Sequence, residues 1–321
     1  MILVTGATGF LGAELAKGLV LRGNKIRCTK RANSVIPKLL HPYSGQITWV
    51  TADLMDAAAL EDALDGITQV YNCAAFVSLK AADKKVMIHT NVTGTANLVN
   101  LCTEKGIRMV HTSSVAAVGE AKPGEMITEK HHLDPSAEND GYAISKLESE
   151  MEVWRGIAEG MDAVIVNPSI ILGVSAGTAG SGQIFATIKN GLKFYTSGTI
   201  GFVDVQDVAK VMIALMESGI SDKRFIVSAE NRAYQQIFPE IAGYLNVPPP
   251  SNLAKPWMLE IAWRAASFWG TVTGKAPAVD KTSARAGSVT RNFDNSAIKK
   301  AINFEFKPLS ETLKEVSQRF K

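Results

Sequence analysis

Short apolar runs alternate with amphipathic stretches from the first residue of the chain onward. The runs read as strands at 2–6, 25–29, 47–54, 69–75, 108–114 and 163–169, and helical periodicity separates them at 11–21, 57–64, 82–105 and after 141. Strands that alternate with helices in this way favour a parallel sheet covered on both faces. The sequence therefore predicts an α/β fold with a doubly wound parallel sheet.

The helix predicted after residue 141 has apolar and acidic positions that separate at helical spacing: Leu147, Met151, Trp154 and Ala158 against Glu148, Glu150 and Glu152. Such a pattern is typical of an amphipathic helix. Tyr142 and Lys146 lie one turn apart at its start, so a phenol and an ammonium share one face. By itself this pair does not distinguish chemistry from two solvated surface residues.

Composition narrows the classes of function. The 321 residues carry a net charge of +3, with 46% hydrophobic and 20% charged residues. This charge is too small to favour nucleic-acid binding, and no apolar run reaches the ~20 residues of a membrane span. The chain begins directly with a strand, and its three cysteines lie in apolar contexts. We expect a cytoplasmic protein with reduced thiols and no bound metal.

Three glycines follow the first strand. Gly6, Gly9 and Gly12 open the helix at 11–21 with the spacing Gly-x-x-Gly-x-x-Gly. In this position the first glycine permits a tight turn, the second lets the backbone approach a pyrophosphate, and the third lets the helix pack on the strand. The phosphates then meet the free N–H groups at the helix start. The motif predicts a dinucleotide site.

The second strand bears on the choice between NAD and NADP. An NAD site usually has an acidic residue about 20 positions past the glycines, to bind the ribose. Here no acidic residue occurs between Glu14 and Asp53, and the interval is basic. Arg31 falls where a 2′-phosphate would bind, which favours NADP over NAD. Asp53 is predicted either to bind the adenine amino group or to cap the helix that follows.

A serine at the end of the fifth strand completes a candidate catalytic group. Ligands of a doubly wound sheet lie beyond the carboxyl ends of its strands, where Ser114 and Tyr142 are expected to converge. A phenol with an intrinsic pKa of ~10 needs a cation to act near neutral pH. Lys146 and the oxidised nicotinamide supply positive charge, and Ser114 would hold the substrate oxygen.

At this point the chain resembles an extended short-chain dehydrogenase/reductase of the NAD(P)-dependent epimerase/dehydratase superfamily. The resemblance extends to about residue 235. It rests on the glycine motif, Ser114, Tyr142-x-x-x-Lys146 and four further segments in order: "NCAA" at 72–75, "TNVTGT" at 90–95, "NPSIILG" at 167–173 and "FVDVQDVA" at 202–209. It implies a Rossmann domain and a smaller C-terminal substrate domain.

The resemblance also implies roles for single residues. Tyr142 is the expected acid/base, Lys146 binds the nicotinamide ribose and lowers the tyrosine pKa, Ser114 orients the substrate and Asn91 supports the site. The expected cofactor-binding residues are Gly6, Thr8, Gly9, Phe10, Leu11, Gly12, Arg31, Lys38, Asp53, Leu54, Ala74, Ala75, Tyr142, Lys146 and Pro168. The aspartates of "FVDVQDVA", Asp204 and Asp207, are expected to be structural and to cap a helix from Val208.

The residues after the serine favour one branch of the superfamily. Dehydratases carry an acidic pair there and epimerases commonly read "SSATVYG", whereas this chain reads "SSVAAVG". The segment, the basic "RCTKRANS" and the C-terminal sequence resemble the dihydroflavonol-reductase and 3β-hydroxysteroid-dehydrogenase-like branch. In that pattern Arg31 and Lys38 contact the 2′-phosphate.

Three functional hypotheses follow. The first is an NADPH-dependent oxidoreductase that reduces a ketone or aldehyde to an alcohol. The second is an NAD(P)-dependent nucleotide-sugar epimerase that uses the same Ser/Tyr/Lys site. The third is a non-catalytic dinucleotide sensor, which the retained Tyr/Lys pair disfavours.

The domain boundaries follow from the same motifs. Residues 1–169 are expected to form the cofactor domain, to which 202–224 returns, and residues 170–201 and 225–321 the substrate domain. A Trp-rich stretch, 257–269, is expected to be a helix over the substrate cleft or at a subunit contact. Homodimers are frequent in the family, through helices at 82–105 and 142–159, although nothing in the sequence requires one.

Overall fold

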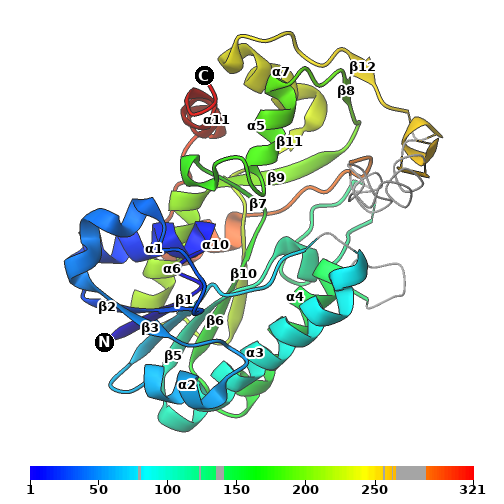
Figure 1. The fold of residues 1–321 in the computed structure, drawn as a ribbon. Helices are drawn as coiled ribbons and strands as arrows, with labels where there is room; N and C mark the ends of the chain where they lie inside the picture. Colours follow the sequence, from blue (N-terminus) through cyan, green and yellow to red (C-terminus); the bar gives the residue numbers. More distant parts are fainter. Residues whose placement is uncertain (79–80, 123, 135–140, 256, 262, 265–286) are drawn as a thin grey trace.

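A parallel sheet forms the centre of the larger part of the molecule (Figure 1). The computed structural model describes residues 1–78, 81–122, 124–134, 141–255, 257–261, 263–264 and 287–321. Within these residues, seven strands pair in the order β10-β6-β5-β4-β1-β2-β3, all parallel. Their bounds are Ile2–Thr5 (β1), Ile26–Lys30 (β2), Ile47–Thr51 (β3), Gln69–Asn72 (β4), Arg108–Thr112 (β5), Ala163–Pro168 (β6) and Lys223–Val227 (β10). The predicted doubly wound α/β fold is confirmed.

The two faces of this sheet are covered by different helices. One face, with Val4 and Val110, packs against α1 (Phe10–Leu21) and α6 (Val205–Glu217). The other, with Leu3 and Met109, packs against α2 (Ala57–Ala63), α3 (Lys84–Lys105) and α4 (Gly141–Ala158). Successive residues of a strand point to opposite faces, so adjacent residues enter different cores.

A smaller part of the chain lies beyond the carboxyl ends of the main strands (Figure 1). Its sheet has the order β11-β9-β7, and β12 pairs with β8. The helices around it share a core of their own, which includes Phe185 and Leu313. The bounds are Ile170–Leu172 (β7), Gly182–Lys189 (α5), Phe194–Tyr195 (β8), Thr199–Asp204 (β9), Glu230–Ala233 (β11), Tyr234–Leu245 (α7), Asn252–Leu253 (β12) and Leu309–Gln318 (α11).

The chain returns to the main sheet over a slightly different range from the one predicted. Helix α6 and strand β10 return, but β9 pairs with β7 in the smaller sheet, so the expected boundaries at 202 and 224 fall inside strands. Helix α10 (Ser296–Ile302) also packs on the larger part, with Ile298 buried in the core that contains α1 and α6. The C-terminal segment thus joins both parts.

The predicted cap of α6 lies three residues earlier than expected. The helix begins at Val205, and the carboxylate of Asp204 accepts the N–H of Gln206 at 2.7 Å. Its second oxygen accepts the hydroxyl of Thr312 from α11 at 2.8 Å. Asp207 accepts the backbone N–H of Lys307 at 2.7 Å. Both aspartates are therefore structural, as predicted, and they fasten the C-terminal segment to α6.

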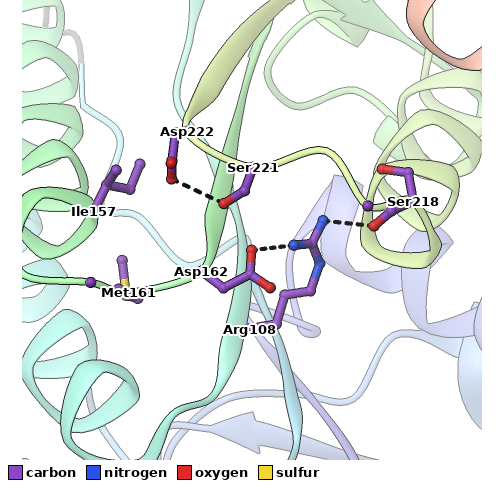
Figure 2. A pocket seen from close by; sticks show the side chains of 9 residues that line it. Arg108, Ile157, Met161, Asp162, Ser218, Ser221 and Asp222 are labelled. Atoms are coloured by element: carbon purple, nitrogen blue, oxygen red, sulfur yellow. Dashed lines mark hydrogen bonds and ion pairs between the residues drawn. The ribbon is translucent and has the colours of Figure 1, made fainter.

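At the opposite, amino end of the main strands, Arg108 of β5 holds the end of α6. Its guanidinium donates to the carbonyl oxygens of Leu215, Met216, Ser218 and Ile220 and pairs with Asp162. Figure 2 shows Arg108 with Asp162 and Ser218 beside a cavity of about 400 Å³ at the amino ends of β5, β6 and β10. Because ligands of this fold bind at the carboxyl ends, we assign these contacts to helix capping.

Only part of the Trp-rich stretch lies within the described residues. Residues 257–261 and 263–264 are helical, with Trp257 61% and Ile261 60% exposed. The remainder lies outside the described residues, and the role of the stretch stays a prediction. None of the described helices combines the length and apolarity that a membrane crossing requires.

Candidate active site

The glycine motif forms the turn between β1 and α1 at the point where the strand order reverses. Gly6 has a φ of +67°, and a Cβ on it would lie 2.6 Å from the backbone nitrogen of Ala74, which follows β4. A Cβ on Gly12 would lie 2.3 Å from the carbonyl oxygen of Gly6. Glycine is therefore required at both positions, because the start of α1 packs directly on the turn and the turn on the end of β4.

The first turn of α1 presents N–H groups that suit an anion. The N–H of Gly9 is used within the turn, at 2.9 Å from Gly6 O, and that of Ala13 bonds to Gly9 O at 3.0 Å. The N–H groups of Phe10 and Leu11 have no partner in the described part of the chain. Together with the positive end of the helix, this cradle fits the pyrophosphate of a dinucleotide.

The basic residues predicted to bind a 2′-phosphate lie near the end of β2. Arg31 directly follows that strand and Lys38 begins the 3-10 helix η1 (Lys38–Gln46). Both are exposed, and neither forms an ion pair with an acidic side chain of the described residues. Both side chains are therefore available to a ligand at this edge.

Asp53 does not cap the following helix. The cap of α2 is Asp56, whose carboxylate accepts the N–H of Ala59 at 3.0 Å. Asp53 instead accepts the N–H of Met55 at 3.0 Å in a local turn after β3. The alternative that Asp53 is a helix cap is therefore wrong. The predicted adenine contact stays a prediction, as does that of Leu54, whose carbonyl accepts Asn97 Nδ2 at 2.9 Å.

Three further predicted cofactor contacts lie at the carboxyl ends of β4 and β6, which flank β5 in the sheet. Ala74 and Ala75 follow β4, and the N–H of Ala74 donates to Thr5 Oγ1 at 3.3 Å, which joins the ends of β1 and β4. Pro168 is the last residue of β6 and is buried. The carboxyl ends of β1, β4 and β6 thus carry the small or rigid residues that the motifs singled out.

Ser114 lies just beyond β5. Its backbone is extended, and its Oγ accepts the N–H of Ala116 at 3.2 Å, which caps the short helix η3 (Val115–Ala117). The residue is 8% exposed. Because this bond uses a lone pair of the oxygen, the hydroxyl proton remains able to donate to a substrate oxygen.

Tyr142 and Lys146 lie in the first turns of α4. Tyr142 is half-buried, and Lys146 is only 7% exposed. The Lys146 ammonium donates to the carbonyl oxygen of Thr112 at 3.0 Å, two residues before Ser114. Burial lowers the pKa of Lys146 from 10.5 to about 8, against the opposing effects of Cys73 and Glu150. The hydrogen bond brings the start of α4 to the end of β5, where Ser114 lies.

Asn91 of α3 is buried and holds two segments of the site together. Its carboxamide bonds to both the N–H and the carbonyl oxygen of Phe76, at 2.7 and 2.9 Å. Its Nδ2 also donates to Ser145 Oγ at 3.3 Å, and that hydroxyl donates to the carbonyl of Tyr142 at 2.9 Å. Asn91 therefore joins the loop after β4 to the first turn of α4, and its support of catalysis stays a prediction.

The sheet face beneath α4 becomes polar toward the carboxyl ends of the strands. This polar face was not predicted from the sequence. Thr5 Oγ1 donates to Asn72 Oδ1 at 2.7 Å, and Asn72 Nδ2 lies 3.1 Å from His111 Nδ1. Burial, with a smaller effect of Lys146, lowers the pKa of His111 to about 3. The imidazole is therefore neutral. These residues alternate with apolar ones in their strands, and their pairing across strands gives no signal in one sequence.

Helix α4 also contradicts the apolar stripe predicted for it. Met151 is 58% exposed, whereas the buried residues include four polar ones: Ser145, Lys146, Ser149 and Glu150. The reason is that the sheet face under α4 offers polar partners instead of an apolar surface. Glu150, which we grouped with the polar face, lies inside.

Comparisons with known proteins agree with this arrangement. A model of the NAD dependent epimerase/dehydratase family matches residues 2–228. Sterol demethylase protein B of Methylococcus capsulatus is 32% identical over 261 residues, 80% of this chain and 78% of that protein. Cinnamoyl-CoA reductase 1 of Petunia hybrida is 30% identical over 242 residues, 70% and 72% of the two chains. The crystal structure of gox2253 superposes with a TM-score of 0.85 at 27% identity, covering 100% of this chain and 97% of that one. The chain belongs to the NAD dependent epimerase/dehydratase family, whose members depend on a nicotinamide cofactor.

Proposed function

We propose that the protein is an NADPH-dependent reductase of a ketone or aldehyde. The observation that carries this proposal is the buried ammonium of Lys146, one turn from Tyr142 and hydrogen-bonded at the end of the strand that leads to Ser114. A buried cation stabilises the anion of a neighbouring phenol, so it adapts Tyr142 to release and regain a proton near neutral pH.

Each residue has a distinct task in this reaction. A bound NADPH supplies the hydride that the carbonyl carbon accepts. Tyr142 donates its hydroxyl proton to the carbonyl oxygen and is reprotonated from solvent, so that one carbonyl, one hydride and one proton give one alcohol. Ser114 donates a hydrogen bond to the same oxygen, which fixes it in line with the phenol.

The preference for NADPH rests on charge at the end of β2. Arg31 and Lys38 are exposed, lack acidic partners within the described residues, and have no acidic neighbour in sequence between Glu14 and Asp53. A guanidinium binds a phosphate with two parallel hydrogen bonds, whereas a ribose hydroxyl favours a carboxylate. Both features favour a cofactor with a 2′-phosphate.

The preference for a carbonyl substrate rests on two observations. Of the apolar residues after the serine, Val115 and Ala116 are partly exposed, whereas Ala117 and Val118 are fully buried. The apolar surface of Val115 and Ala116 suits an apolar carbonyl compound better than a sugar. A relative with 30% identity is named a cinnamoyl-CoA reductase. The epimerase alternative uses the same residues and differs in that no net cofactor oxidation takes place.

The test of cofactor choice is a fluorescence titration with NADPH and NADH. We expect NADPH to bind more tightly, and Arg31→Ala to remove that preference. The matched control is Lys25→Ala, which removes one exposed cation at the opposite end of β2. Tighter NADH binding, or equal losses in both variants, contradicts the NADPH assignment.

The test of reaction is NADPH oxidation against a panel of aldehydes, ketones and UDP-sugars. We expect carbonyl-dependent oxidation that Tyr142→Phe abolishes while NADPH still binds. Interconversion of a UDP-sugar without net cofactor oxidation would establish the epimerase instead. Cofactor binding with no turnover of any member of the panel would favour the sensor.

A further inference from the structure

A buried ion pair lies behind the candidate site, between α4 and the edge strand β10. Glu150 is 1% exposed and the Arg224 side chain 7%, and Arg224 Nη1 lies 2.9 Å from Glu150 Oε1. The same carboxylate oxygen accepts the indole N–H of Trp154 at 3.2 Å. Burying two charges costs several kcal/mol per ion in general, and apolar pairs of similar volume often stabilise a fold as well. Stability alone therefore gives no reason for this pair.

The second oxygen of Glu150 connects the pair to the candidate site. It accepts Asn167 Nδ2 at 2.8 Å, and the same Nδ2 donates to the carbonyl oxygen of Ser114 at 3.0 Å. Asn167 is fully buried. Because both partners of Nδ2 are acceptors, the opposite orientation of the carboxamide would set oxygen against oxygen. The carboxylate thus fixes the orientation of Asn167, and Asn167 fixes the backbone at Ser114.

The other end of the chain of contacts is equally constrained. Arg224 donates to the carbonyl oxygens of Glu129 and His131. The carboxylate of Glu129 in turn accepts the N–H of Ile226 in β10 at 2.9 Å. The guanidinium is therefore held by two carbonyl groups of the segment 129–131 as well as by the carboxylate, and Glu150 has a fixed partner on either side.

We propose that Glu150 is a positioning residue for the active site, which through Asn167 sets Ser114 relative to the Tyr142 and Lys146 side chains of its own helix. Glu150 lies one turn after Lys146 on α4, so the same helix that carries the acid/base also holds the serine segment of β5. This inference rests on the proposed function, because it assigns Ser114 and Tyr142 to one substrate oxygen.

Charge gives Glu150 a second effect on the site. The ionisable groups that act electrostatically with Lys146 are Cys73 just after β4, His111 of β5 and Glu150 of α4, with Arg224 beyond Glu150. Tyr142 lies one turn before Lys146 on the same helix. Burial raises the pKa of Cys73 to about 12 and lowers that of His111 to about 3, so both are neutral near pH 7. The Glu150 carboxylate raises the pKa of Lys146 against the larger effect of burial. Removing this negative charge is expected to lower the pKa of Lys146.

Three variants separate positioning from stability. Asn167→Leu removes the donor to Ser114. Glu150→Gln leaves one acceptor oxygen between Asn167 Nδ2 on one side and Arg224 Nη1 on the other, so one of these donors loses its acceptor. The double variant Glu150→Met/Arg224→Met replaces the ion pair by apolar side chains. The control is Glu148→Gln, the same exchange two residues earlier on α4. The double variant also removes the donor to the carbonyl oxygens of Glu129 and His131, so its kcat is measured well below its thermal midpoint. Under these conditions we expect Asn167→Leu and the double variant to lose ~10- to 100-fold in kcat with unchanged NADPH affinity.

Two further readouts respond to positioning and not to stability alone. In Glu150→Gln the alkaline limb of the kcat/KM profile moves to lower pH, because Lys146 loses its proton earlier, whereas Glu148→Gln leaves the limb in place. Hydrogen exchange of the Ala116 amide, which bonds to Ser114 Oγ, becomes faster in Asn167→Leu. This exchange is measured without substrate, so it tests the positioning of Ser114 even if the proposed reaction is wrong.

These measurements either support or contradict the positioning role of Glu150. A double variant with wild-type kcat and wild-type Ala116 exchange would overturn the proposal and leave the pair as a structural feature. Slower turnover with faster Ala116 exchange supports it. If the Ala116 amide exchanges faster in Asn167→Leu but Tyr142→Phe keeps full carbonyl reduction, the proposed function is wrong. The positioning of Ser114 by Asn167 then still holds.

Discussion

Helices α4 and α6 cover opposite faces of one sheet and obey different rules. The face of α6 that packs on the sheet is apolar, with Val208, Val211, Met212 and Leu215 almost fully buried. The corresponding face of α4 contains Ser145, Lys146, Ser149 and Glu150. The same strands supply both surfaces, so the difference arises from alternate residues of single strands.

The difference between the two helices shows that buried polar groups are concentrated on the face of the sheet that carries the candidate site. Beneath α6 the strands present Val110 and Val166, and burial of apolar area stabilises the contact. Beneath α4 the strands end in residues such as Asn72 and His111, and each buried polar group of the helix has to find a partner. Ser149 Oγ donates to Ser145 O at 2.6 Å, for example. A helix that only covers the sheet follows the hydrophobic period, and a helix that carries the candidate chemistry departs from it.

Removing a polar group from α4 is expected to have the largest effect. Lys146→Met lowers turnover by ~10²- to 10⁴-fold, because the phenol loses the cation that adjusts its acidity. The same change stabilises the fold at neutral pH. A pKa of about 8 in place of 10.5 means that burying the ammonium costs roughly 3 kcal/mol below pH 8. Loss of the hydrogen bond from Lys146 to the carbonyl oxygen of Thr112 offsets about 1 kcal/mol of this stabilisation.

The difference in unfolding free energy between the wild type and Lys146→Met is expected to change with pH. Between pH 8 and 10.5 the unfolded chain holds a proton on Lys146 that the folded chain has lost, so the free energy of unfolding of the wild type rises with pH relative to Lys146→Met. The thiols of Cys28, Cys73 and Cys102, whose pKa values are raised to about 12, lower the stability of both proteins above pH 9, and this effect cancels in the difference. Denaturant unfolding of both proteins at pH 7 and pH 10 measures the difference in their unfolding free energies. A constant difference would mean that Lys146 is not buried as an ammonium.

Removing an apolar group from α6 is expected to have the opposite signature. Leu215→Ala truncates a side chain with no exposed surface, which costs about 2–5 kcal/mol of unfolding free energy. The turnover of the folded fraction stays unchanged, because α6 packs on the face away from α4. The control is Leu21→Ala on α1, which is 64% exposed and should cost less than about 0.5 kcal/mol. A fall in kcat for Leu215→Ala would show that the two faces are coupled.

A smaller effect is expected at the start of α6, where the helix does use polar contacts. Asp204→Ala removes the helix cap and leaves the buried hydroxyl of Thr312 without its acceptor, together about 2 kcal/mol. Asp56→Ala is the control, because it removes an exposed cap from α2 at a cost of about 1 kcal/mol. Thermal unfolding of the two variants compares them. Equal losses would mean that the contact with α11 contributes nothing beyond the cap.

The two helices also mark how far sequence reasoning extends. The first six strands of the main sheet, helices α1 to α4 and the glycine turn follow from periodicity and local backbone requirements, and these are found where they were predicted. Strand β10, the seventh of the main sheet, and the strands of the smaller sheets were not predicted. Ser114, Tyr142 and Lys146 could be proposed because the doubly wound sheet brings its strand ends to one edge. Glu150, Asn167 and Arg224 could not, because their meaning depends on partners 17 and 74 residues away from Glu150. In the sequence Glu150 cannot be distinguished from the neighbouring Glu148 and Glu152, so it was predicted to lie on the solvated face.

Met151 gives the smallest effect and the most direct check of the inverted helix. The residue belongs to the apolar stripe that the sequence predicts, yet it is 58% exposed in the single chain. Met151→Gln should therefore change the free energy of unfolding by less than about 0.5 kcal/mol and leave kcat unchanged. A matched core change is Val153→Ala on the same helix, a fully buried residue whose truncation should cost at least about 1 kcal/mol. A large loss for Met151→Gln, accompanied by a lower mass in size-exclusion chromatography, would mean that a second copy covers this face of α4. In that case the stripe is apolar because it packs against another chain, and the sequence pattern describes the dimer.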